Sequence, residues 1–288
     1  MSKTDIGIDL GTANTVITLG KKGVVLSEPS AIAYHTHTKE VLAVGKRAYQ
    51  MIGKTPDYIE VIRPLSGGVI SDDRMTQYMI REFILQVTGH RLTKPRIIIC
   101  VPSFITDVEK RAVVEAAMSA GSRKAYLIDE PIAALIGAGV NIGKARGNMV
   151  VDIGGGTADI AVISLGGVVE STSIKIAGDK FDEAVVKYVR RKHNVLIGER
   201  TAEEMKMTIG CVYPYPEEKV MEVRGRCLMT GLPRTFTVTS SEMMEAFEDV
   251  SGRIVEAVHS VLERTAPELV GDIATNGILM TGGGSLVY

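Results

Sequence analysis

The stretch of the chain best equipped to do chemistry is Val151–Gly167. It begins with apolar residues that lead to Asp152, continues through Gly154–Gly156 to Thr157, and ends in a β-rich run. This order predicts a strand, a tight glycine turn and a second strand. The N–H groups of such a turn can bind a phosphate, and Asp152 at its mouth could face a metal ion on that phosphate. A plain hairpin with a glycine-rich turn explains this segment alone equally well.

The same plan occurs near the start of the chain. Within Asp5–Gly20, an apolar run leads to Asp9, and Gly11 and Thr12 follow before a second β-rich run. Because internal repetition dictates architecture, two such hairpins predict two similar domains that grip one phosphate chain. Asp9 and Asp152 would suit Mg²⁺, which keeps several waters and takes one or two carboxylates. A pair of turn-forming aspartates is the alternative, and the duplication disfavours it.

The segments that must position these hairpins alternate between strand and helix. Apolar and β-branched runs predict buried strands, and apolar residues at helical spacing predict helices. The expected strands are residues 24–26, 31–34, 41–43, 96–101, 126–128, 220–225, 234–238 and 277–280, and the expected helices are residues 46–51, 71–87, 106–120, 131–137, 181–193, 201–209 and 241–263. Residues 61–70, with Pro64 and paired glycines, are expected to form a crossing loop. The alternation predicts mostly parallel sheets covered by helices.

Length, charge and cysteine content narrow the class of protein. The chain has 288 residues, which is enough for two domains at roughly 100–200 residues each. Its net charge of −1 provides no basic field that would recruit nucleic acid. Its three cysteines lie far apart and in no metal-binding spacing, which suits a reducing cytoplasm. The sequence shows neither a signal peptide nor an apolar run of about 18 residues, so we expect a cytoplasmic protein.

Taken together, the motifs resemble a known superfamily. DLGT (9–12), DIGGGT (152–157) and TGGGS (281–285) are similar to the phosphate and adenosine motifs of actin, heat-shock chaperones and sugar kinases. Longer stretches resemble the MreB family of bacterial actins; these are SEPSAIA (27–33), VIRPLSGGVI (61–70), LIDEPIAALIGAG (127–139), LIGERTAEEMK (196–206), VRGRCLMTGLP (223–233) and ERTAPELVGDIATNGILMTGGG (263–284). The resemblance extends over almost the whole chain.

The resemblance implies an α/β, actin-like ATPase fold. Two duplicated domains would surround a nucleotide cleft, and each would carry a smaller inserted subdomain. Domain I would comprise residues 1–140, with its insertion at about 30–64, and domain II residues 141–288, with its insertion at about 178–240. Members of the family continue past the third glycine turn. We therefore expect a C-terminally truncated second domain that leaves a sheet edge and apolar surface uncovered.

The resemblance also implies ATP with Mg²⁺ in the cleft and a slow ATPase. Asp9 and Asp152 would hold the hydrated ion. Glu130, at the junction between strand and helix in LIDEP, would orient or deprotonate the attacking water, with Thr157 and Asp152 as further catalytic candidates. Without the resemblance, Glu130 is an ordinary first-turn glutamate that the helix dipole favours. The family usually has glutamate where this chain has Asp129.

A larger set of residues would contact the nucleotide. Glu203 and Lys206, three apart on one helix face, would reach the ribose and adenine, although a surface ion pair is the alternative. The full set is Thr12, Ala13, Asn14, Gly154, Gly155, Gly156, Glu203, Glu204, Met205, Lys206, Gly283, Gly284, Ser285 and Leu286.

By resemblance, the chain is an ATP-dependent filament protein that organises cell-wall synthesis and maintains rod shape. Its partners would be further copies of itself, cell-wall synthesis and rod-complex membrane proteins, and the inner face of the cytoplasmic membrane. The loop of residues 89–94, with one apolar and three potentially basic residues, could contact anionic lipid, although a solvated loop fits equally well. The alternative functions are a sugar-type kinase of the same superfamily and a chaperone-type ATPase, for which the chain has no separate substrate domain.

Overall fold

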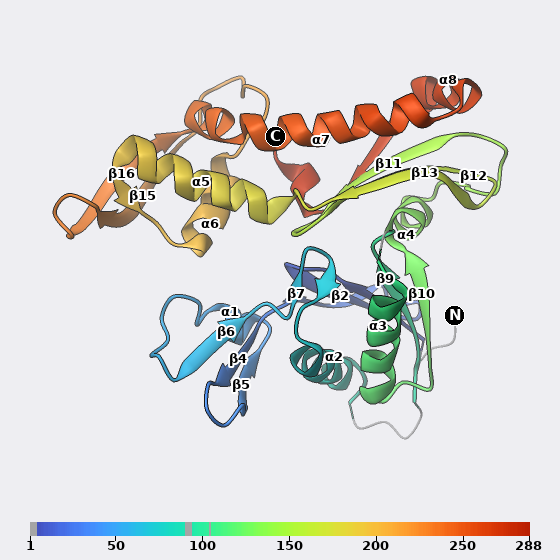
Figure 1. The fold of residues 1–288 in the computed structure, drawn as a ribbon, viewed down its shortest axis with the longest axis horizontal. Helices are drawn as coiled ribbons and strands as arrows, with labels where there is room; N and C mark the ends of the chain where they lie inside the picture. The colour runs from blue at the N-terminus through green and yellow to red at the C-terminus, as the bar shows by residue number, and fades with distance from the viewer. Residues whose placement is uncertain (1–4, 90–93, 104) are drawn as a thin grey trace.

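The computed structural model describes residues 5–89, 94–103 and 105–288. The chain forms two lobes, with the first lobe (residues 5–129) below and the second lobe (residues 138–288) above in Figure 1. Each lobe contains one main sheet, and each carries a smaller sheet on the left in Figure 1. Helix α4 (Glu130–Gly137) joins the lobes, because it follows the first main sheet and packs on the second. The domain boundary predicted at residue 140 stays a prediction.

The main sheet of the first lobe is mixed. Its strands are β1 (Ile6–Leu10), β2 (Asn14–Leu19), β3 (Val24–Pro29), β9 (Arg96–Val101) and β10 (Lys124–Asp129), in the order β10-β9-β1-β2-β3. The first three form an antiparallel meander, whereas β9 and β10 run parallel to β1. Short turns force neighbouring strands to be antiparallel. The prediction of mostly parallel sheets is therefore wrong.

Two helices cover one face of this sheet, and the sequence explains where each begins. They are α2 (Asp73–Thr88) and α3 (Asp107–Ser119). Asp72 caps α2 by accepting a hydrogen bond from the N–H of Met75 at 2.9 Å, and Thr106 caps α3 through a reciprocal capping box with Glu109. Apolar side chains four residues apart, beginning at Met75, are buried along α2. Both predicted helices are confirmed.

The second lobe repeats the meander, and the two central strands of its main sheet are the buried ones. Its strands are β11 (Asn148–Ile153), β12 (Ala158–Ser164), β13 (Gly167–Ile174) and β17 (Ile278–Thr281), in the order β13-β12-β11-β17, and only β17 is parallel to its neighbour β11. The helices of this lobe outside its small subdomain are α7 (Ser240–Arg264), α8 (Pro267–Asn276) and the 3-10 turn η1 (Gly283–Leu286). Every residue from Ala158 to Ile163 is buried, because α7 packs on one face of β12 and α4 on the other.

Small subdomains extend both lobes on the same side. In the first lobe the subdomain comprises β4 (Ile32–His35), β5 (Val41–Val44), β6 (Ile59–Ile62) and α1 (Lys46–Tyr49). In the second lobe it comprises α5 (Gly178–His193), β14 (Val195–Leu196), α6 (Glu199–Ile209), β15 (Val220–Cys227) and β16 (Pro233–Thr239). These elements fall within the two insertions that the sequence predicts, although the limits of those insertions are not fixed by the structure.

Residues 61–70 differ from the crossing loop that we expect from the sequence. They contain the end of β6 and a short hairpin of β7 (Leu65–Ser66) and β8 (Val69–Ile70). The turn consists of Gly67 and Gly68, whose φ angles are 56° and 78°. Paired glycines adopt the positive φ angles that a two-residue hairpin turn requires. The paired glycines therefore indicate a hairpin, and the loop assignment is wrong.

Strand β17 is an edge strand of the second sheet among the described residues. It lies at the end of the strand order, and its Ile278 and Met280 are 40% and 49% exposed.

Within the described residues, no helix is both long enough and apolar enough to cross a membrane.

Candidate nucleotide site

A cleft between the two lobes brings most of the predicted site residues together. Its volume is about 420 Å³, and its walls come from both acid-and-glycine hairpins, the start of α4, helix α6 and the third glycine turn. The predicted residues that line it are Asp9, Thr12, Ala13, Asn14, Glu130, Asp152, Gly154, Gly155, Gly156, Thr157, Glu203, Lys206, Gly283 and Gly284. Segments far apart in the sequence thus share one cavity, as the duplicated hairpins lead us to expect.

Four predicted contact residues lie beside the cavity without lining it. Met205 is fully buried in the core of the second lobe, and Glu204 points to solvent. Ser285 donates its hydroxyl hydrogen bond to the carbonyl of Gly282 at 2.7 Å, and Leu286 is 85% exposed. The phase of α6 explains the first pair, because residues three apart on a helix face one side while those between them face elsewhere.

The turns of the two hairpins pack directly against each other. A Cβ atom placed on Gly155 would lie 2.6 Å from the Cβ of Ala13 and 3.0 Å from its backbone nitrogen. A Cβ atom placed on Gly156 would lie 2.6 Å from the hydroxyl oxygen of Thr12. Distances this short exclude any side chain, so glycine is required at both positions. The missing side chains let the two turns face one small volume.

The third glycine turn closes over the second hairpin. Strands β11 and β17 pair in register, so that Asp152 lies beside Thr281 and the turn comes immediately afterwards. Gly282 has a φ of 80°, and a Cβ atom there would lie 2.3 Å from the carbonyl oxygen of Ile153. Gly284 would place a Cβ atom 2.4 Å from the side chain of Ile153. The backbone of this turn therefore packs on the second hairpin as closely as sterics permit.

Several residues that line the cleft are not in the predicted set, and Gly68 is one of them. Gly68, in the turn between β7 and β8, donates its N–H to the hydroxyl of Thr12 at 3.1 Å and lines the cleft. The paired glycines at 67 and 68 are the signal that could have identified it. Other lining residues that the prediction did not name are Leu10, Gly11, Val16, Ser27, Gly178, Met207 and Gly282.

Two carboxylates face each other across the cleft. Asp9 and Asp152 occupy equivalent places near the carboxyl ends of β1 and β11. Burial, followed by the charge of Asp152, raises the pKa of Asp9 to about 6. Burial also raises the pKa of Asp152. Each carboxylate is thus held in an unfavourable, charge-repelling environment that a cation would relieve.

This pair fits a hydrated magnesium ion better than a metal held only by protein. The described residues contain no group of three or more histidine, cysteine or acidic side chains that could hold a metal. Magnesium keeps several of its waters and takes one or two carboxylates besides phosphate oxygens. Asp9 and Asp152 would hold such an ion, which would neutralise phosphate charge when bound.

Glu130 is the most strongly perturbed acid of the cleft. Strand β10 ends at Asp129, in register with Val101 of β9, so that Glu130 begins α4 at the carboxyl edge of the parallel strands. Burial first, then the charges of Asp159, Asp9 and Asp152, raise its pKa well above the ordinary value. A carboxyl group held at this edge of the cleft is placed to orient a water molecule or to accept a proton from it.

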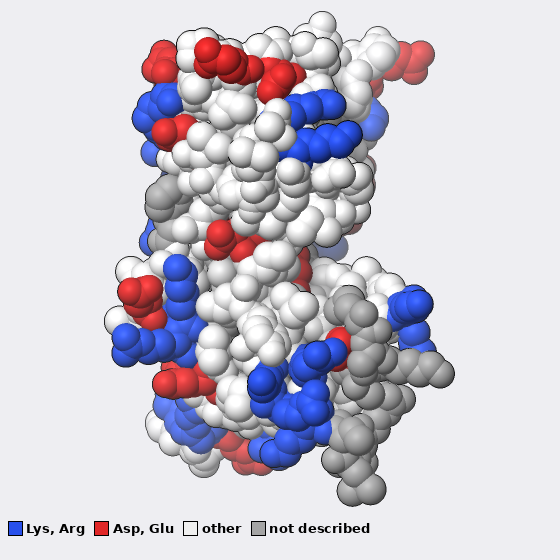
Figure 2. Space-filling model, turned by 90° about the vertical axis from the view of Figure 1, so that its right-hand side faces the viewer, with Lys and Arg blue, Asp and Glu red and all other residues white. Residues whose placement is uncertain are grey.

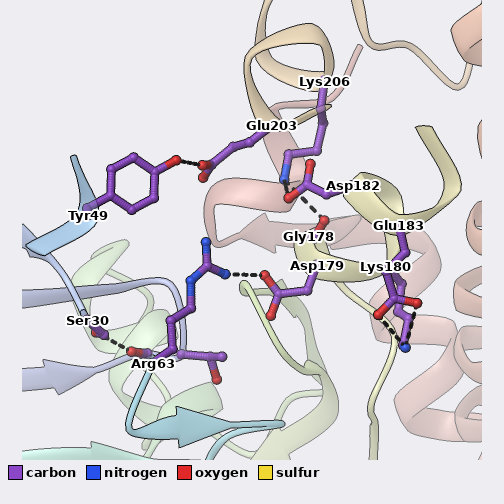
Figure 3. Close-up of polar contacts among 12 residues, drawn as sticks. Ser30, Tyr49, Arg63, Gly178, Asp179, Lys180, Asp182, Glu183, Glu203 and Lys206 are labelled. Carbon is purple, nitrogen blue, oxygen red and sulfur yellow. Dashed lines mark hydrogen bonds and ion pairs between the residues drawn. The ribbon is translucent and has the colours of Figure 1, made fainter. Parts of the chain in front are cut away.

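Helix α6 presents the two side chains predicted to contact the ribose and adenine. The Lys206 ammonium donates to the carbonyl of Gly178 at 3.1 Å and forms an ion pair with Asp182 at 2.9 Å. Figure 3 shows both contacts at the start of α5, with Glu203 on the same face of α6. Lys206 and Glu203 both line the cleft and form part of one side wall.

Two lobes, duplicated meander sheets and a cleft with paired aspartates define an actin-like fold. The crystal structure of MreB5 of Spiroplasma citri bound to ADP matches with a TM-score of 0.95 and 38% identity, covering 99% of this chain and 86% of that chain. The same protein bound to AMPPNP matches with a TM-score of 0.94 and 38% identity, covering 100% of this chain and 86% of that chain. MamK in its double helical filament, at 23% identity and a TM-score of 0.80, covers 97% of this chain and 85% of its own, and shares the fold alone.

Sequence comparison narrows the class to a family. The model of the MreB/Mbl protein family matches residues 3–288, and the chain belongs to this family. Cell shape-determining protein Mbl of Bacillus cereus is 50% identical over 289 residues, covering 100% of this chain and 87% of the relative. Cell shape-determining protein MreB of Escherichia coli K12 is 50% identical over 293 residues, covering 100% and 84%. The resemblance drawn from the motifs is confirmed.

Proposed function

We propose that this chain is a nucleotide-dependent, actin-like filament protein that maintains rod cell shape by organising cell-wall synthesis. The observation that carries the proposal is the meeting of both acid-and-glycine hairpins in one cleft. The chain is 50% identical to relatives named cell shape-determining proteins. No feature of the cleft or of these relatives favours the alternative of a sugar-type kinase.

The proposed ligand is ATP with Mg²⁺. The solved relatives hold ADP or AMPPNP, and the hairpin turns of this chain offer backbone N–H groups to a phosphate chain. Asp9 and Asp152 hold the hydrated ion, and Glu130 orients the attacking water with the help of Thr157. Glu203 and Lys206 form the wall against the nucleoside. The activity is a slow ATP hydrolysis coupled to polymerisation.

The proposed partner is first of all another copy of the chain. Bound nucleotide closes the cleft, and the closed subunit presents complementary ends. Head-to-tail contacts that do not close by rotation generate filaments. Hydrolysis then returns the subunit to a less associated state. Further partners are cell-wall synthesis and rod-complex membrane proteins.

We place the filament on the inner face of the cytoplasmic membrane. Most of the loop of residues 89–94 lies outside the described residues, but residues next to it carry positive charges that can attract anionic lipid. Lys94, Arg123 and Lys124 are exposed, and Tyr126 is 48% exposed beside them on β10. Figure 2 shows Lys and Arg side chains gathered on the first lobe of this face. Each basic residue near an anionic surface contributes about 1 kcal/mol.

Sedimentation and electron microscopy test the proposal directly. Purified protein should form filaments with ATP and Mg²⁺ on anionic vesicles, and should pellet far less with neither nucleotide nor Mg²⁺. Phosphate transfer to a small-molecule acceptor, with no sedimenting polymer under any nucleotide, would replace the proposal with the kinase.

A further inference from the structure

The inserted subdomains of the two lobes touch across the mouth of the cleft. Tyr49, the last residue of α1, donates its hydroxyl hydrogen bond to the carboxylate of Glu203 on α6. Figure 3 shows the tyrosine and the glutamate facing each other from opposite lobes. Arg200, one turn earlier on α6, lies over the Tyr49 ring at 5.2 Å from its centroid. The tyrosine is thus held by its hydroxyl and by its ring.

An ion pair spans the same opening a short way from the tyrosine. Arg63, just after β6, contacts Asp179 near the start of α5 at 2.8 Å, and the two side chains are 24% and 33% exposed. The backbone N–H of Asp179 donates to the carbonyl of Gly155 at 2.7 Å. A contact made by the first lobe at the mouth is therefore connected through a single residue to the glycine turn of the second hairpin.

We propose that Tyr49 and Arg63 form a gate that holds the cleft closed over its nucleotide and sets the rate of nucleotide release. The inference rests on the proposed nucleotide site and adds two positioning residues to it. Tyr49 positions Glu203, which lines the cleft, and Arg63 positions Asp179 and with it the turn at Gly155.

The packing at the bottom of the cleft explains why the gate lies at its mouth. At the bottom, the turns at Ala13 and Gly155 already touch and leave no space for a side chain. The lobes can therefore separate with the least loss of packing on the side of the inserted subdomains, where these two polar contacts would break. Such contacts can exchange with water, whereas the close-packed turns cannot.

The chemistry of the tyrosine suits this role. A glutamate carboxylate has about four acceptor positions, so Glu203 can accept from Tyr49 and from a ribose hydroxyl at the same time. Burial and the bond to Glu203 raise the pKa of Tyr49 to about 12. The hydroxyl therefore stays protonated and remains a donor across the physiological range.

Release of a fluorescent ATP analogue, chased with excess ATP in a stopped-flow instrument, measures the gate. Tyr49→Phe removes only the hydroxyl and should raise the dissociation rate about tenfold or more, since the lost bond has a charged acceptor. Arg63→Asp should raise it comparably, and adding Asp179→Arg should restore it by rebuilding the pair with reversed charges. Tyr58→Phe is the matched control, because Tyr58 is 53% exposed in the same subdomain.

Each outcome decides the proposal. Unchanged release in both Tyr49→Phe and Arg63→Asp overturns it, as does equal acceleration in Tyr58→Phe. If the wild-type chain binds no nucleotide at all, the proposed function fails, and hydrogen exchange of the nucleotide-free protein then judges the gate alone. Faster exchange at the start of α6 in Tyr49→Phe than in Tyr58→Phe supports the gate, and equal exchange overturns it.

Discussion

The two hairpins share one plan but supply different things to the cleft. The first, β1 to β2, brings the side chains of Thr12 and Ala13 to its turn, whereas the second, β11 to β12, brings Gly155 and Gly156. The side chains of one turn occupy the space that the glycines of the other leave open. Duplication has therefore produced two turns that fit each other, and they fit because they are not identical.

The lobes also differ in the segments that follow the strand paired in parallel with each hairpin. In the first lobe, β9 is followed across the sheet by β10, which ends at Asp129, directly before Glu130. In the second lobe, β17 ends at Thr281 and is followed by the turn of Gly282. In the proposed site, the first lobe therefore supplies the candidate acid Glu130, and the second lobe supplies the glycine backbone that lines the cleft. Substitutions in each lobe can test this division.

Removing the acid of the first lobe should have the largest effect. Glu130→Gln keeps the shape of the side chain but cannot accept a proton, so phosphate release should slow about a hundredfold, within the range of general acid–base catalysis. Nucleotide affinity and ATP-dependent sedimentation should persist. Glu115→Gln, on the exposed face of α3, is the control. Phosphate release at the wild-type rate would assign the chemical step to another group.

A buried acid in the second lobe should act on stability instead. Burial raises the pKa of Asp182 to about 6 despite its ion pair with Lys206. Between about pH 4 and pH 6, the Asp182 carboxyl therefore holds a proton in the folded state and releases it in the unfolded chain. The resulting contribution to the free energy of unfolding is fully present below about pH 4 and is lost as the pH rises through 6, with a size on the order of 3 kcal/mol.

Urea denaturation at several pH values measures this contribution. The unfolding free energy of Asp182→Asn should lack this part of the pH dependence, while Glu183→Gln, on the exposed side of the same helix, should retain it. A pH dependence in Asp182→Asn equal to that of the wild type would remove Asp182 as its source. Loss of hydrolysis in Asp182→Asn, with binding intact, would contradict the division between the lobes.

Local patterns predicted the parts of the cleft that each hairpin makes by itself. The order of acid, glycine and β-branched residues is local, so both turns could be predicted from adjacent residues. The wall at Gly68 depends on contact with Thr12, more than fifty residues away, and no local pattern carries that information. The sequence also did not show which face of α6 lines the cleft. Met205 lies in the core, whereas Met207 lines the cleft.

Filling the space that one turn leaves for the other should weaken nucleotide binding about tenfold. The Cβ of Gly155→Ala would meet the Cβ of Ala13, and overpacking of this kind costs about 1–3 kcal/mol. Ala13→Gly alone should change affinity little, and added to Gly155→Ala it should recover part of the loss. Calorimetric titration with ATP measures all three variants. Equal losses for Gly155→Ala and Ala13→Gly would show that the turns do not fit as described.

The paired aspartates provide the finest test, because here the two hairpins are most alike. Asp9→Asn and Asp152→Asn each remove one carboxylate, and each should lower the part of ATP affinity that Mg²⁺ adds about fivefold, an effect of about 1 kcal/mol. Affinity measured in chelator should stay constant or rise, because the variants carry less negative charge near the phosphates. If only one variant loses the Mg²⁺ effect, the ion binds to one lobe. The two hairpins would then be alike in their backbone but not in the role of their aspartates.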